Sequence, residues 1–153
     1  FTMRTGSRTF EAAAFLRRSG ADTGDVKKLF QNDLEGTIAK YDIIQNAKMY
    51  HEGIAVAKVD HTVGRITAAQ AADELLNISG IDTSFVLFPD QEGRVILSAR
   101  SMGDVNVQVV LEKLGGGGHR TIAGAQMQGV SIQEAKDRLK EVIRQMLEEG
   151  DVS

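Results

Sequence analysis

Four consecutive glycines, Gly115–Gly118, followed directly by His119, constrain the fold of this 153-residue sequence more than any other stretch. The run separates a segment of helical periodicity from a segment of strand periodicity, so it lies inside a domain. Glycine loses more conformational freedom on folding than any other residue, and four in a row therefore destabilise a fold that does not need them. The run indicates either a helix cap with a turn, for which Gly115 alone would serve, or a place where another group approaches the main chain closely.

The segments on either side of the glycines predict a helix and a strand. In residues 106–114, valines and leucines recur at i, i+3, i+4 and i+7, which is one buried helical stripe. In residues 123–130, small or apolar residues alternate with Gln126 and Gln128, as in a half-exposed strand. The residues expected inside are Val107, Val110, Leu111, Leu114, Ala125 and Met127.

Three more strands and two more helices are expected from Gly53 onward. Residues 53–60 have the short, β-branched character of a strand, and Phe85–Phe88 and Arg94–Ser101 flank a turn-rich loop. Two capping boxes predict helices, Thr67 with Gln70 and Ser131 with Glu134. The residues expected inside the second of these helices are Ile132, Ala135, Leu139, Val142, Ile143 and Met146. The resulting order β-α-β-β-α-β-α predicts an α/β (mixed α+β) fold, with helices packed on one mixed sheet.

The first third of the sequence predicts helices. Short helices are expected from Thr9 to Gly20 and over residues 22–31, and a longer one from Asp33 onward, ended by Gly53. We therefore expect a helical connector over residues 1–52 and a second domain over residues 53–150. Because the chain begins with Phe1 inside apparent structure, we interpret it as a piece of a longer protein.

The composition excludes several classes of function. The formal net charge is −3 and the isoelectric point about 5.6, which disfavours a general duplex-DNA binder because such proteins carry a basic surplus. The sequence contains no cysteine, so disulfides and thiolate metal sites are excluded. No apolar run approaches the roughly 18 residues of a membrane span.

The candidate site is an anion pocket around the glycines. Peptides without side chains can turn successive N–H groups toward one phosphate, and a histidine adds a further donor. Upstream, Arg100 can bind a phosphate through two N–H groups, and Ser101 and Asn106 offer neutral hydrogen bonds. Their structural alternatives are a surface arginine, a strand-end serine and a helix cap. The full candidate set is Arg100, Ser101, Asn106, Gly116, Gly117, Gly118 and His119.

Metal binding is not indicated by the spacing of the titratable residues. The three histidines do not share a ligand spacing with one another. Asp60–His61 has no second ligand cluster near it and is interpreted as a solvated pair. The acidic pairs Asp73–Glu74 and Glu148–Glu149 are expected on solvated helix faces. No metal or cofactor is therefore expected in this chain.

The motif SARS…DVN followed by GGGGH…AG resembles the DHH-associated substrate-binding domain of the DHH phosphoesterases. The opening residues 1–22, together with residues 29–50, are similar to the segment that follows the last metal-binding aspartate motif in GdpP-type (YybT-type) cyclic-di-AMP phosphodiesterases. The family motif often reads GGGH-x-x-A-A-G, whereas Ile122 stands here at the first alanine position, at an expected buried strand start.

The resemblance implies a longer enzyme with two Mn²⁺ in a separate DHH domain, against which this domain would close. The enzyme would hydrolyse cyclic-di-AMP to linear pApA, and this chain alone would be inactive. The candidate set above would contact the dinucleotide, and Arg4, Thr5 and Arg8 would lie near the catalytic cleft. The resemblance also implies a cytoplasmic domain of a membrane-anchored protein from a Gram-positive bacterium, with a homodimer as a further expectation.

Three other functions remain open from the sequence. One is the corresponding domain of a nanoRNase or RecJ-like exonuclease, for which the acidic isoelectric point disfavours long strands but not dinucleotides as substrates. Another is a non-catalytic RNA-binding module, because alanyl-tRNA synthetases end in a related glycine-rich domain. The third is a structural or dimerisation domain in which the glycines only turn the chain.

Overall fold

A computed structural model describes residues 23–149, with side chains from residue 34 onward. The expected helix from Thr9, and with it Arg4, Thr5 and Arg8, lies outside the described residues. The chain divides into two units, Phe1–Ala39 and Lys40–Ser153, and the second holds the sheet and the candidate site. In chain order the elements are α2 (Thr23–Gln45), β1 (Ala47–His51), β2 (Gly53–Lys58), α3 (Arg65–Leu75), β3 (Ile81–Pro89), β4 (Val95–Ser101), α4 (Val107–Glu112), β5 (Gly117–Gly118), β6 (Ile122–Met127) and α5 (Ile132–Glu149).

The strands form one six-stranded sheet in the order β1-β2-β3-β4-β6-β5. Strands β2 and β3 are parallel and are joined through α3, while every other neighbouring pair is antiparallel. The mixed α+β class and the element order expected from Gly53 are confirmed. The expectation that helix continues to Gly53 was wrong, because α2 ends at Gln45 and residues 47–51 form strand β1, which pairs with β2. The two-residue β5 was not expected, because two residues show no periodicity.

Two helix predictions were wrong in detail. The short helix over residues 22–31 and the longer helix from Asp33 are parts of one helix, α2, since no proline interrupts residues 23–45. Helix α3 begins at Arg65 after an extended Gly64 and has no side-chain cap, so Thr67 lies inside its first turn and cannot be the N-cap. The second capping box is confirmed. The Glu134 N–H donates to Ser131 Oγ at 3.1 Å, and the Ser131 N–H donates to Glu134 Oε1 at 3.4 Å.

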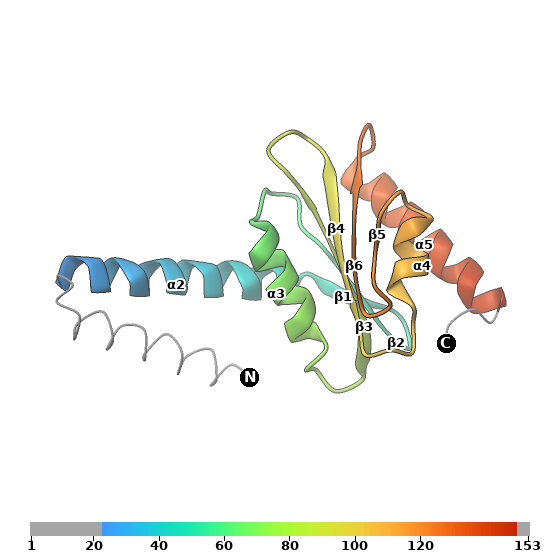
Figure 1. Ribbon diagram of the computed structural model, residues 1–153, viewed down its shortest axis with the longest axis horizontal. Helices are drawn as coiled ribbons and strands as arrows, with labels where there is room; N and C mark the ends of the chain where they lie inside the picture. The colour runs from blue at the N-terminus through green and yellow to red at the C-terminus, as the bar shows by residue number, and fades with distance from the viewer. Residues whose placement is uncertain (1–22, 150–153) are drawn as a thin grey trace. The chain divides into compact units, whose positions relative to one another are not determined.

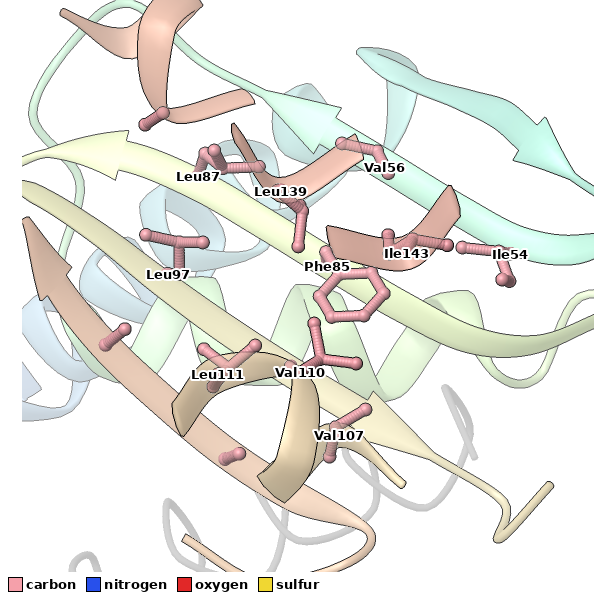
Figure 2. Packing of buried hydrophobic residues seen from close by; sticks show 14 of the residues in the cluster. Ile54, Val56, Phe85, Leu87, Leu97, Val107, Val110, Leu111, Leu139 and Ile143 are labelled. Atoms are coloured by element: carbon pink, nitrogen blue, oxygen red, sulfur yellow. The ribbon is translucent and has the colours of Figure 1, made fainter. Parts of the chain in front are cut away.

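Helices cover both faces of the sheet (Figure 1), with α3 on one face and α4 and α5 on the other. Strand β3 supplies both cores because its side chains alternate between the faces. Phe85 and Leu87 pack with α4 and α5, while Val86 and Phe88 pack with α3. Figure 2 shows Phe85 between Val110 of α4 and the α5 side chains Leu139 and Ile143.

The apolar residues expected inside α4, β6 and α5 are buried or partly buried, as their periodicity predicts. No helix in residues 23–149 combines the length and apolar character needed to cross a membrane.

Candidate functional site

Gly115 ends α4 in a left-handed cap. Its φ is +87°, a conformation that side-chain-bearing residues rarely adopt. The Gly116 N–H donates to the Leu111 carbonyl at 2.7 Å, and the Gly115 N–H donates to the Glu112 carbonyl at 3.2 Å. These two hydrogen bonds are those of a Schellman motif, so the cap predicted for Gly115 is confirmed.

Gly116 and Gly118 are required because they lie against strand β6. A Cβ on Gly116 would come within 2.1 Å of the Gly124 carbonyl oxygen, and a Cβ on Gly118 within 2.5 Å of the Ile122 carbonyl oxygen. Gly118 also has φ +146°. Packing against the sheet thus explains these two glycines without any ligand.

Gly117 differs from its neighbours. Its φ lies outside the left-handed region, and a Cβ built on it would meet nothing within 4 Å. Neither backbone strain nor packing requires a glycine there. Gly117 is therefore the member of the run that neither strain nor packing explains, and its missing side chain leaves open space.

The amides of the run do not all point to one anion. The N–H groups of Gly115 and Gly116 donate to α4, and the His119 N–H donates to the Ile122 carbonyl at 2.6 Å. For these three amides, the idea of a nest of convergent N–H groups is wrong, because the helix cap and the β5–β6 turn use them.

Backbone hydrogen bonds bring the two halves of the candidate set to the same end of the sheet. The Ser101 N–H donates to the Thr121 carbonyl at 2.9 Å, and the Val107 N–H donates to the Arg120 carbonyl at 3.0 Å. The Arg120 guanidinium donates to the Gly103 carbonyl at 3.0 and 3.2 Å. The loop between β4 and α4 is thereby tied to the turn that carries the histidine.

Two of the candidate side chains already have structural partners. Asn106 Oδ1 accepts from the Gln108 and Val109 N–H groups at 3.1 and 3.3 Å, so it caps α4. The buried Ser101 Oγ accepts from the Gly103 N–H at 3.0 Å. By contrast, the His119 side chain is exposed and makes no hydrogen bond within the described part of the chain.

Arg100 is held in place by α3. Its Nε donates to Asp73 Oδ1 at 3.0 Å and its Nη1 to the Ala99 carbonyl at 2.9 Å. A guanidinium has five N–H donors, so these contacts leave others for a ligand. Asp73 is exposed, as expected for a solvated helix face, and its carboxylate orients Arg100. For Glu74 that expectation was wrong, because its side chain is partly buried and pairs with Lys40 at 3.4 Å.

An open groove of about 680 Å³ lies along β4 and β6 beside the glycines. The strand register places Ser98 opposite Gly124 and Gly124 opposite Gly117. This row of paired residues across β4, β6 and β5 therefore carries a single side chain, the hydroxymethyl group of Ser98. The next row toward the start of β4 holds Ile96 and Gln126. The groove is lined by Arg65, Ile96, Leu97, Ser98, Gly115, Gly116, Gly124, Ala125, Gln126 and Gln128.

Sequence reasoning missed most of this groove, because its residues come from four separate segments and no local motif marks those outside the glycine run. It was also wrong to expect a buried position for Ile122. The side chain is 51% exposed, since Ala123 and Ala125 turn to the core and Ile122 turns to the opposite face. Its row holds Arg100, next to the row of Ser98, Gly124 and Gly117.

No group of three or more histidine or acidic side chains that could hold a metal ion occurs within the described residues. His61 pairs with Asp42 instead, with 3.3 Å between Nε2 and Oδ2 and both side chains exposed. The described residues therefore do not fit a Mn²⁺ centre.

Comparisons with known proteins show which proteins this chain is similar to. The chain is 47% identical over 152 residues to the cyclic-di-AMP phosphodiesterase GdpP of Geobacillus thermodenitrificans, covering 98% of this chain and 23% of that protein. It is 43% identical over 141 residues to the cyclic-di-AMP phosphodiesterase PdeA of Listeria monocytogenes, covering 91% and 22%. The chain thus spans less than a quarter of these relatives.

The fold is also found in a solved structure of low sequence similarity, the exopolyphosphatase-related protein from Bacteroides fragilis. The TM-score is 0.66 at 19% identity, with 86% of this chain and 41% of that chain covered. Residues 51–149 match the DHHA1 domain, and this chain belongs to that family.

Proposed function

We propose that this chain is the substrate-binding domain of a phosphodiesterase that hydrolyses cyclic-di-AMP to pApA. Two cyclic-di-AMP phosphodiesterases, GdpP and PdeA, are 47% and 43% identical to the chain over 98% and 91% of its length. A protein of which this chain is one part would carry out the hydrolysis, and the chain would hold the dinucleotide.

The observation that carries this proposal is the open position at Gly117. Gly115, Gly116 and Gly118 are explained by the helix cap and by packing on β6, whereas Gly117 is not. A missing side chain beside an exposed histidine gives a phosphate direct access to the backbone. We therefore assign phosphate contacts to the backbone of Gly117 and Gly118 and to the side chains of His119 and Arg100. Gly116, whose N–H donates to the Leu111 carbonyl, lies beside them without a free N–H donor.

Ser101 and Asn106 act mainly by positioning in this proposal. Their oxygen atoms hold the Gly103 loop and the start of α4, which fixes the loop that is tied to the histidine turn. The Asn106 side-chain amide retains N–H donors for a sugar or phosphate oxygen.

Mn²⁺ would be held outside the described residues, in a DHH domain against which this chain closes. We assign no catalytic step to residues 34–149. In the longer protein, chelation of the metal should abolish hydrolysis of cyclic-di-AMP, while binding of the dinucleotide to this chain alone should not respond to the chelator.

The test is calorimetric titration of the 153-residue chain with cyclic-di-AMP, pApA and a short oligoribonucleotide. His119→Ala and Gly117→Val should each weaken dinucleotide binding about tenfold or more, because one removes a donor and the other fills the open position. His51→Ala is the matched control, since His51 is exposed on β1 at the opposite edge of the sheet.

If His119→Ala and Gly117→Val bind the dinucleotide as tightly as the control His51→Ala and the unaltered chain, the phosphate pocket is refuted. Preference for the oligoribonucleotide would favour the exonuclease or RNA-binding function instead. If no ligand binds to the isolated chain, the same variants are titrated within the longer protein, where unchanged affinity would leave the glycines as a turn only.

A further inference from the structure

The groove continues past the glycines, away from Arg100, to a second set of polar side chains. Three successive rows on the α3 face of the sheet hold Arg100, then Ser98 with Gly124, then Gln126. Rows two residues apart are separated by about 7 Å along a strand. The arginine and glutamine ends are thus about 14 Å apart at the backbone, and both side chains are long enough to reach inward.

The middle of the groove is nearly free of side chains. Gly116 and Gly124 contribute only backbone, and Ser98 contributes a single hydroxyl. A planar ring can lie directly on such a floor, whereas any larger side chain there would lift it away. The groove volume of about 680 Å³ lies within the range of small-molecule sites.

Arg65 forms one wall of the groove from the start of α3. Its Nη2 lies 4.0 Å from Asp90 Oδ2, but that carboxylate is bound more closely by Arg94, with Nε at 2.7 Å. The Arg65 side chain is 54% exposed, so its planar guanidinium is available to stack on a ring.

Gln126 lies at the end of the groove away from Arg100, and its side-chain amide is available to a ligand. The side chain is exposed, lines the groove and makes no hydrogen bond within the described residues. A glutamine amide presents one donor and one acceptor side by side, which matches the N6–H donor and N7 acceptor of adenine. The same amide is a poorer match for a purine that carries a carbonyl oxygen at position 6, because that purine presents two acceptors.

From these features we infer that Arg65, Ser98, Gly124 and Gln126 form an adenine-binding subsite, with Gln126 selecting the 6-amino group. This inference rests on the proposed function for its biological ligand, because the phosphate next to the base would be held at Gly117 and His119. The subsite itself takes a purine base and requires no phosphate.

The experiment is ¹⁵N NMR titration of the chain with adenosine, inosine and inorganic phosphate as separate probes. Adenosine and inosine differ at position 6 and at the neighbouring ring nitrogen, so the pair tests the amide directly. Adenosine should shift the Gln126 side-chain amide and bind about fivefold or more tightly than inosine. Gln126→Ala should bring the two affinities together, while the control Gln145→Ala on α5, beyond the opposite face of the sheet, should preserve the preference.

The outcomes separate the inference from the proposed function. If phosphate shifts Gly117 and His119 but adenosine shifts neither Gln126 nor Gln128, the base subsite is wrong and the phosphate pocket stands. If adenosine is preferred through Gln126 but phosphate shifts nothing, the subsite stands and the proposed function loses its support. A preference for adenosine that survives Gln126→Ala overturns the role of the glutamine.

Discussion

At the scale of single residues, neighbouring glycines in one run have different physical roles. Gly116→Ala should destabilise the fold by about 3 kcal/mol, because its Cβ would overlap the Gly124 carbonyl and the Ala125 side chain. Both belong to the paired strand β6, so neither can move without disturbing the sheet. Urea denaturation monitored by circular dichroism measures the loss.

Gly117→Ala is the matched control for that substitution. Its Cβ meets nothing, and the smaller entropy of the unfolded chain should leave stability unchanged or raised by up to about 1 kcal/mol. Similar losses for both variants would show that flexibility, rather than contact with β6, is what the run provides.

At the scale of elements, Asn106 can be tested as a cap and as a ligand separately. Asn106→Ala should cost about 1 kcal/mol through loss of the two hydrogen bonds at the start of α4. Asn106→Asp should keep that stability, since aspartate caps as well as asparagine. If Asn106 also contacts substrate, the aspartate should still weaken dinucleotide binding, because it brings a negative charge toward a phosphate.

The β3–β4 hairpin should carry a pH-dependent contribution from Asp90. Partial burial raises the pKa of this carboxyl, but hydrogen bonds from the Arg94 backbone and guanidinium and from the Glu92 N–H outweigh it, so the pKa is lowered. A lowered folded-state pKa means that the stabilisation is present above the unfolded-state value of about 4 and is lost as the pH falls through the folded-state value.

Asp90→Asn isolates that contribution from other carboxylates, among them Glu141, whose pKa is lowered by its hydrogen bond from Arg144. The wild type should be more stable than the variant at pH 7, and the difference should shrink as the pH falls below about 4 and disappear below the folded-state pKa of Asp90. Thermal melts of both proteins across this range measure it, and a difference independent of pH would contradict the assignment.

The elements also show where sequence reasoning ends. Strong periodicity and a cap box identified α4, β6 and α5 with their buried residues, because these signals are local. The position of β6 between β4 and β5 depends on pairing between segments that are distant in the sequence. Because of that pairing, Gly116 must be a glycine, whereas Gly117 need not be. The groove residues Arg65, Ser98 and Gln126 carry no motif, so only the pairing of distant strands reveals that they share a site.

At the scale of the whole folded unit, strand β3 links two cores on opposite faces of the sheet. Phe85 and Leu87 are fully buried against α4 and α5, and Val86 and Phe88 are fully buried beneath α3. A strand that contributes to both layers cannot leave one without exposing the other. The two faces should therefore unfold in a single cooperative transition.

Leu139→Ala tests this coupling from the face remote from the groove. The fully buried leucine of α5 should cost about 2–5 kcal/mol when truncated. If unfolding is cooperative, hydrogen exchange of the slowest α3 amides should accelerate as much as that of the slowest α5 amides, although α3 belongs to the other core. Unchanged protection in α3 would mean that the faces open independently. In that case the helix that carries Arg65 and orients Arg100 could move without disturbing the α5 core, and ligand closure over the groove would not need to be coupled to global stability.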